Sequence, residues 1–316
     1  MNKLIVLTVI LLAVVSCERK TIKKVDVSGI EMEVLVERFE QKFYISTKNT
    51  LQALKNEYPY LFPHQNDSVW LDKIKNEVEL FNESQIVFGD FNNEKLQIEA
   101  LFKHIKYYHS SFTAPKVITL ITNLDYESKV VYADSFLFVS LDMYLGKNSE
   151  IYQDFPLYLA QNFDKSNLVV DIAKTIGEKY FILDKNRQFI DVMINEGKKM
   201  YLLDSYLPLV SDVKKIGYTT DKYDWTVANE AQIWKYFVEN KLLYSSDTEL
   251  YTRFIADAPF SKFYIDIDKQ SPGKIGVWLG WQIVRSYMNN NNVTLQQLLQ
   301  TNTEEIFKNS KYKPKK

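Results

Sequence analysis

The sequence predicts an α+β fold in which a small mixed sheet is followed by a mostly helical half. Two short runs rich in β-branched and aromatic residues, Lys116–Thr122 and Ser135–Leu141, lie in the first half and indicate buried strands. Helical patterns dominate from Leu157 onward. Gly and Pro number only 9 and 8 among 316 residues, which disfavours turn-rich all-β architectures.

The composition is that of an ordinary folded protein. Hydrophobic residues make up 46 % of the chain and charged residues 25 %, which excludes global disorder. Lys and Arg number 39 against 40 Asp and Glu, so there is no basic excess of the kind that nucleic-acid binding requires. A single cysteine excludes an intramolecular disulfide. We therefore expect no nucleic-acid partner.

Residues 1–16 have the pattern of a secretory signal peptide. The apolar run Leu4–Val15 is shorter than the ~20 residues that span a bilayer. The run ends in Val14-Val15-Ser16-Cys17, which resembles the lipobox of bacterial lipoproteins, in which the chain is cleaved before the cysteine and the thiol is acylated. The alternative is a buried thiol at the end of a core helix. Because Cys17 stands at the cleavage point, we predict a lipid anchor there, which attaches the protein to a membrane.

The remainder of the chain divides into a tether and one domain. Residues 17–30 are polar and weakly patterned, which predicts a flexible tether. No Pro-, Gly- or Ser-rich linker interrupts residues 31–316, so we expect a single α+β domain. Its basic end, Lys308–Lys316, is predicted to be an exposed tail.

In the first half, an imperfect alternation predicts a strand within Glu31–Phe39, and Val130–Tyr132 is a candidate for another. Tyr58–Pro63 is expected to be an aromatic loop. Helices are predicted over Thr50–Asn56, Ser68–Phe81 and Asn93–Tyr108. In the last of these, one apolar stripe is expected from Leu96, Ala100, Leu101, Ile105 and Tyr108.

In the second half, the four asparagines Asn289–Asn292 predict a turn. Helices are predicted over Leu168–Tyr180, Arg187–Leu203, Asp221–Leu243, Thr248–Ile255, Ile275–Met288 and Thr294–Phe307.

The sequence lacks the standard catalytic motifs for phosphate binding, dinucleotide binding, serine hydrolysis and zinc hydrolysis. Of the three histidines, His104 and His109 are five residues apart, about 140° around a helix, so they cannot share a face as zinc ligands. We expect no catalytic residue, no metal site and no cofactor.

Two carboxylates lie inside apolar helical runs, Asp171 and Glu196. An acid in such a run is either paired or functional. For each, the alternative is an acid that faces solvent or a core acid paired with Lys or Arg.

The block Ser271–Met288 is apolar nearly all round, as a buried helix is. Gly276 and Gly280 are four residues apart and would permit close packing of backbone against backbone. If buried, Gln282 and Arg285 cannot stay unpaired. This helix is either a core element that satisfies neighbouring carboxylates or the wall of a cleft.

The lipobox and several later blocks resemble the gliding-motility lipoprotein GldB family of Bacteroidetes. The resemblance covers essentially the whole mature chain, through Phe102–Tyr108, Pro115–Ile121, Leu141–Gly146, Ser271–Met288 and Lys308–Lys315. It implies a lipid-anchored cell-envelope protein required for gliding, a structural or interaction subunit with protein partners in the motility and secretion apparatus. It brings no enzymatic reaction. Glu18, Arg19 and Lys20 form no acidic export tract, which favours a periplasm-facing position.

A second resemblance is to zincin metalloproteases, in which a helix after the sheet carries H-E-x-x-H and the next helix carries a glutamate ligand. Glu196 keeps the residue type of that third ligand. At the histidine spacing the chain offers Asp171 with Thr175, or Ala173 with Gly177, and neither pair can bind zinc tightly. The resemblance implies a non-catalytic zincin-like fold whose cleft binds a partner. The alternative function is a peptidase-like envelope hydrolase with an unrecognised carboxylate site.

Overall fold

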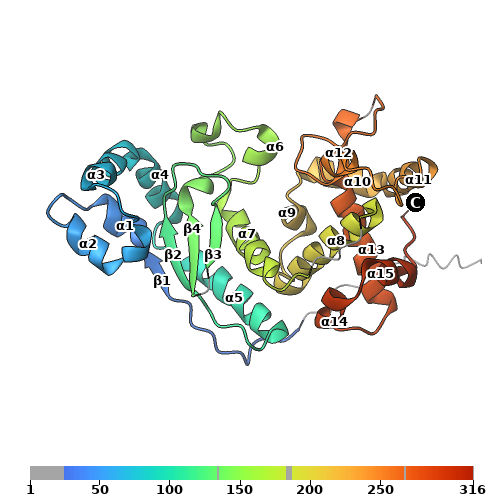
Figure 1. Ribbon diagram of the computed structural model, residues 1–316, viewed down its shortest axis with the longest axis horizontal. Helices are drawn as coiled ribbons and strands as arrows, with labels where there is room; N and C mark the ends of the chain where they lie inside the picture. The colour runs from blue at the N-terminus through green and yellow to red at the C-terminus, as the bar shows by residue number, and fades with distance from the viewer. Residues whose placement is uncertain (1–24, 134, 183–186, 267, 316) are drawn as a thin grey trace, which may run out of the picture.

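The computed structural model describes residues 25–133, 135–182, 187–266 and 268–315, so Cys17 and the predicted signal peptide lie outside the described residues. A four-stranded mixed sheet occupies the first half of the chain, as predicted (Figure 1). Its strands, in the order β1-β2-β4-β3, are β1 (Val36–Arg38), β2 (Lys116–Leu120), β4 (Phe136–Ser140) and β3 (Val130–Ala133). The first three are parallel, and β3 pairs antiparallel with β4.

The centre of the sheet lies at β2, where Val117 pairs with Val36 on one side and Leu137 on the other. Val117 and Leu137 are completely buried. The three middle residues of β2, Val117–Thr119, are buried, because the strand is central in the sheet, whereas the edge strand β3 is partly exposed.

The helices of the first half precede β2. They are α1 (Phe39–Tyr44), α2 (Leu51–Glu57), α3 (Asp67–Asn76), α4 (Val78–Phe88) and α5 (Asn92–Tyr108), with a 3-10 helix at Pro59–Leu61. The prediction of one helix over Ser68–Phe81 is wrong, because the chain breaks at Glu77, whose carboxylate accepts from Tyr44 and binds Lys73. In α5, Leu96 is 64 % exposed, and the buried side chains include Ile98 and Phe102.

The second half is helical, as predicted. Its helices are α6 (Leu157–Ala160), α7 (Lys165–Glu178), α8 (Phe189–Tyr206), α9 (Asp212–Ile216), α10 (Thr220–Ala228), α11 (Glu230–Glu239), α12 (Glu249–Phe254), α13 (Ile275–Asn290), α14 (Leu295–Gln300) and α15 (Thr303–Ser310). Two predicted helices are divided. Asn229 ends α10 and begins α11, and Asn302 caps α15 through its side chain. Asn289 and Asn290 extend α13 instead of forming a turn.

The second half is organised around the crossing of α8 and α13 (Figure 1). Trp278 and Trp281 of α13 are completely buried. A Cβ atom on Gly280 would collide with the Met193 carbonyl, and one on Gly197 would collide with the backbone of Gly280. The predicted close approach of backbones at Gly280 is therefore confirmed, and both helices contribute a glycine to it.

Among the helices of the described ranges, none combines the length and the apolar character that crossing a bilayer requires.

Candidate functional site

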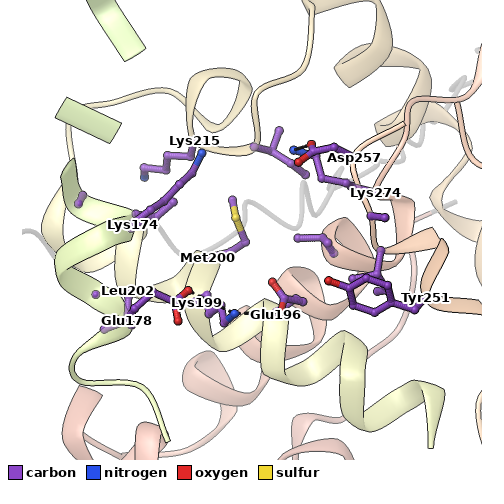
Figure 2. A pocket seen from close by; sticks show the side chains of 17 residues that line it. Lys174, Glu178, Glu196, Lys199, Met200, Leu202, Lys215, Tyr251, Asp257 and Lys274 are labelled. Carbon is purple, nitrogen blue, oxygen red and sulfur yellow. Dashed lines mark ion pairs between the residues drawn. The ribbon is translucent and has the colours of Figure 1, made fainter. Parts of the chain in front are cut away.

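A cleft of about 360 Å³ lies between α7, α8 and the region around the start of α13 (Figure 2). This volume is in the range of small-ligand pockets. Side chains from α7 and α8 form one side, side chains from α12, the loop after it and the start of α13 form the other, and Lys215 and Ile216 of α9 also contribute. The lining includes Ala173, Lys174, Gly177, Glu178, Glu196, Lys199, Met200, Tyr251, Asp257 and Lys274.

The helical periodicity brings the first wall together. Ala173 and Gly177 lie four residues apart on α7 and therefore share one face. Glu196 and Met200 have the same spacing on α8. The small side chains of α7 leave open the space that the longer side chains of α8 border. On the opposite wall, Lys274 adopts a left-handed backbone conformation (φ 57°) as the N-cap residue of α13.

Ion pairs lie on both sides of the cleft. Lys199 Nζ lies 3.1 Å from Glu196 Oε1 and 3.3 Å from Glu178 Oε1. Across the cleft, Lys274 Nζ lies 2.7 Å from Asp257 Oδ1. Figure 2 shows the Glu196 and Lys199 side chains on the same side of the cleft, with Asp257 and Lys274 facing them.

The ion pairs shift the pKa values of Lys199 and Asp257. Partial burial acts to lower the pKa of Lys199, but the Glu196 and Glu178 carboxylates outweigh it and raise the pKa above its ordinary value. Burial likewise acts to raise the pKa of Asp257, and the adjacent Lys274 ammonium group reverses the shift, so this pKa is lowered.

The inner surface of the cleft is apolar. Met200, Ile255, Leu203 and Val277 all line it and are less than a tenth exposed. In Figure 2 the sulfur end of the Met200 side chain points into the open space. The cleft therefore offers a ligand an apolar surface surrounded by charged groups of both signs.

Asp171 lies beside this cleft, among polar partners from α7 and from two loops. It accepts a hydrogen bond from Tyr144 Oη at 3.1 Å and binds Lys129 and Lys174 at 3.0 and 3.3 Å. Burial acts to raise the pKa of Asp171, but Lys174 and Lys129 outweigh it, and the pKa is lowered. Thr175, half-buried on α7, is not among the described residues that line the cleft.

Arg285 lies in a buried network that joins α8, α9 and α13. Its guanidinium group donates two hydrogen bonds of 2.7 Å to Asp204 and two, of 2.6 and 2.8 Å, to Asp212. Asp204 also accepts from Trp281 Nε1 at 2.7 Å and binds Lys215 at 2.9 Å. The guanidinium carbon lies 3.8 Å from the centre of the Trp281 ring. Lys215 lines the cleft, so the network fixes one edge of it.

Gln282 departs from the prediction that a buried polar side chain on this helix would be paired. It is 3 % exposed, and within the described part of the chain neither its amide oxygen nor its amide nitrogen has a hydrogen-bond partner. Its neighbours Trp281 and Ile283 are completely buried, because α13 packs against other elements over most of its surface.

The five residues that the sequence singled out therefore differ in their relation to the cleft. Glu196 lines the cleft, Asp171 pairs with a lysine that lines it, and Arg285 supports its edge through Asp204 and Lys215. Gln282 and Thr175 are absent from the described lining.

The cleft has a limited chemical repertoire. Among the described residues, no cluster of three or more His, Cys, Asp or Glu side chains could hold a metal ion. The histidines lie elsewhere: His104 Nδ1 is 2.8 Å from the Ala100 carbonyl, and His109 is stacked on Tyr180. The described lining contains lysines, carboxylates, one tyrosine and apolar groups.

Sequence reasoning missed Asp257 and Lys274. They are 17 positions apart, and no periodic pattern links them, since an irregular segment brings them together. The pair Glu196–Lys199 had a signal, because residues three apart on a helix are neighbours.

A family model described as "Gliding motility protein GldB" matches residues 20–314. No curated protein and no solved structure matches the chain. The resemblance to zincins thus has no support among the solved structures.

Proposed function

Because the chain belongs to the GldB family of gliding motility proteins, we propose that it is a lipid-anchored interaction subunit of the motility apparatus, in which the cleft between α7, α8 and α13 binds a segment of a partner protein. The observation that carries this proposal is the construction of the cleft. An apolar inner surface receives apolar side chains, and fixed charges of both signs select charged neighbours on the partner.

The proposed role is non-catalytic. Peptide hydrolysis needs a polarising metal, or a nucleophile with its base, or carboxylates free to transfer a proton. The carboxylates of the described cleft are bound to lysines: Glu178 and Glu196 to Lys199, and Asp257 to Lys274. These pairs support recognition, and the pair with Lys274 lowers the pKa of Asp257.

The proposed location is the cell envelope, with acylated Cys17 in a membrane and the domain facing the periplasm. The lipobox pattern before Cys17 supports this location. Within the described ranges, no helix offers another means of crossing the bilayer.

Site-specific photo-cross-linking in gliding cells tests the proposal. A photoreactive residue replaces Tyr251, which lines the cleft and is 53 % exposed, or Ile86 of α4, which is 77 % exposed and outside the described lining. We expect a discrete protein adduct from position 251 alone, and its loss when Met200→Trp fills the cleft. Equal adducts from both positions, or an adduct that persists in the Met200→Trp protein, would contradict the proposal.

A further inference from the structure

The first described residues of the chain lie against α14. Val25 lines a groove of about 390 Å³ together with Tyr107, Tyr108 and the segment 293–296. In Figure 1 the N-terminal segment passes the end of α5 on its way to this place. Val25 stands eight positions after Cys17, and a fully extended chain over eight positions spans at most about 29 Å. Acyl chains on Cys17 would therefore hold this side of the domain close to the membrane surface.

The basic C-terminal segment begins near this groove, at the end of α15, and runs from there to α11 (Figure 1). Ser286 Oγ and Asn290 Nδ2 donate to the Ser310 carbonyl, at 2.7 and 2.8 Å. Asn291 Nδ2 donates to the Asn309 carbonyl at 3.1 Å. The end of α15 is thus fixed to the end of α13, and the chain that follows α13 enters the groove that Val25 lines.

The tail presents its lysines to solvent from a fixed backbone. Tyr312 Oη donates to Glu230 at 2.8 Å, and the Tyr312 ring contacts Trp234 edge-on. The Lys315 backbone amide donates to the same carboxylate at 3.2 Å. The lysine residues on either side are exposed, and we call this group the basic face: Lys308, Lys311, Lys313 and Lys315.

The tether, like the basic face, carries more positive than negative residues. In sequence, the tether adds four cationic residues, Arg19, Lys20, Lys23 and Lys24, close to the predicted anchor. The acidic residues of the tether and α15 are Glu18, Asp26, Glu304 and Glu305. The last two lie in the first turn of α15, four and three residues before Lys308, and they offset part of the positive charge at that end of the helix.

We propose that the basic face binds the headgroups of anionic phospholipids in the membrane that holds Cys17. This inference rests on the proposed lipid anchor. An acyl anchor brings the lysines within electrostatic range, and each exposed lysine near an anionic surface adds a salt-sensitive attraction.

Binding in this manner gives the domain an orientation. On α8, Tyr201 and Ser205 line the groove at the tether, whereas Glu196 and Met200 line the cleft. Tyr201 and Ser205 are about 140° and 180° around the helix from Glu196. The cleft therefore opens on the opposite side of α8 from the membrane-facing groove, toward a partner protein in the aqueous space.

The test uses the full-length lipoprotein, purified from membranes and reconstituted into vesicles. The chain has one native cysteine, at position 17, so a Lys313→Cys substitution gives a single labelling site when Cys17 is acylated. An environment-sensitive fluorophore at position 313 is measured on phosphatidylcholine vesicles and on vesicles that also contain phosphatidylglycerol, with a quencher attached to the lipid. A Tyr251→Cys protein, labelled at the cleft, is the matched control.

We expect quenching at position 313 to rise severalfold on the anionic vesicles. The rise should disappear in high salt and in a variant with Lys308→Gln, Lys311→Gln and Lys315→Gln, while position 251 stays unquenched. Equal quenching of position 313 on both vesicles, or quenching of position 251, would overturn the inference.

Flotation of the same samples separates the inference from the proposed anchor. Protein that floats with anionic vesicles only would refute the anchor and support the basic face. Protein that floats with neither kind of vesicle would refute both.

Discussion

Replacing Arg285 should destabilise the protein far more than replacing Glu196, although both are charged residues of apolar helices. Arg285→Ala removes four hydrogen bonds and leaves the Asp204 carboxylate, which is completely buried, without its bidentate partner. Glu196→Ala removes one ion pair, between side chains that are 26 % and 32 % exposed.

The magnitudes follow from these environments. Removing one member of a buried pair costs about 3–5 kcal/mol, mostly because the other charge is left buried. Asp204 keeps its contacts with Lys215 and Trp281, so we expect the lower end of that range for Arg285→Ala, about 3 kcal/mol. An exposed pair such as Glu196–Lys199 contributes about 0–1 kcal/mol. Arg285→Lys should lie between the two variants, because an ammonium group cannot make the bidentate contacts.

Urea denaturation of the purified variants, followed by tryptophan fluorescence, measures these differences. Near-equal losses for Arg285→Ala and Glu196→Ala would refute the reasoning. Such a result would mean that the burial of Asp204 does not determine how much stability Arg285→Ala loses.

Three further predictions concern packing, pH and the anchor. Gly280→Ala should lower the free energy of unfolding by at least about 1–3 kcal/mol, because the added Cβ atom has no space beside Met193. The control Gly29→Ala lies in open space and should change the free energy of unfolding by less than about 0.5 kcal/mol. Equal urea midpoints for the two variants would argue against the close helix crossing. Burial lowers the pKa of His109 to about 4, below about 6.5 in an unfolded chain. As the pH falls, the unfolded state therefore takes up the proton first. The stability that comes from burying a neutral His109 is present at neutral pH and is lost as the pH falls from about 6.5 to about 4. His109→Gln should flatten the decline of the urea midpoint across that window, and an unchanged slope would contradict the assignment. Cys17→Ser should abolish the incorporation of labelled fatty acid into the protein in cells, and persistent labelling would contradict the predicted anchor.

The fold was predictable to the extent that it depends on local patterns. The short β-branched runs located β2 and β4, and the helical periodicity located α7, α8 and α13. The breaks at Glu77 and Asn229 were missed because neither has a Gly or Pro signal. Glu77 is held by a tertiary contact with Tyr44, which local patterns do not encode.

The site was predictable only in part. Glu196 stood out as a carboxylate in an apolar run, and Arg285 stood out as a charge on a buried helix. The partners of Arg285, Asp204 and Asp212, are 81 and 73 positions away in the sequence. No spacing rule connects residues so far apart, and the same holds for the junction of Asp257 with Lys274.

The central claim is that the cleft acts by binding a partner and that its carboxylates perform no chemistry. Gliding of cells that carry Met200→Trp or Glu196→Gln in the chromosomal copy tests it most directly, with Leu209→Trp as an exposed control, 81 % accessible and outside the described lining, and with protein abundance measured in parallel. The account predicts that Met200→Trp stops gliding at normal abundance, that Glu196→Gln reduces gliding only in part because it removes one recognition charge, and that Leu209→Trp leaves gliding intact. Loss of gliding in the Glu196→Gln cells together with normal gliding in the Met200→Trp cells, at equal abundance, would contradict the claim and indicate a catalytic carboxylate.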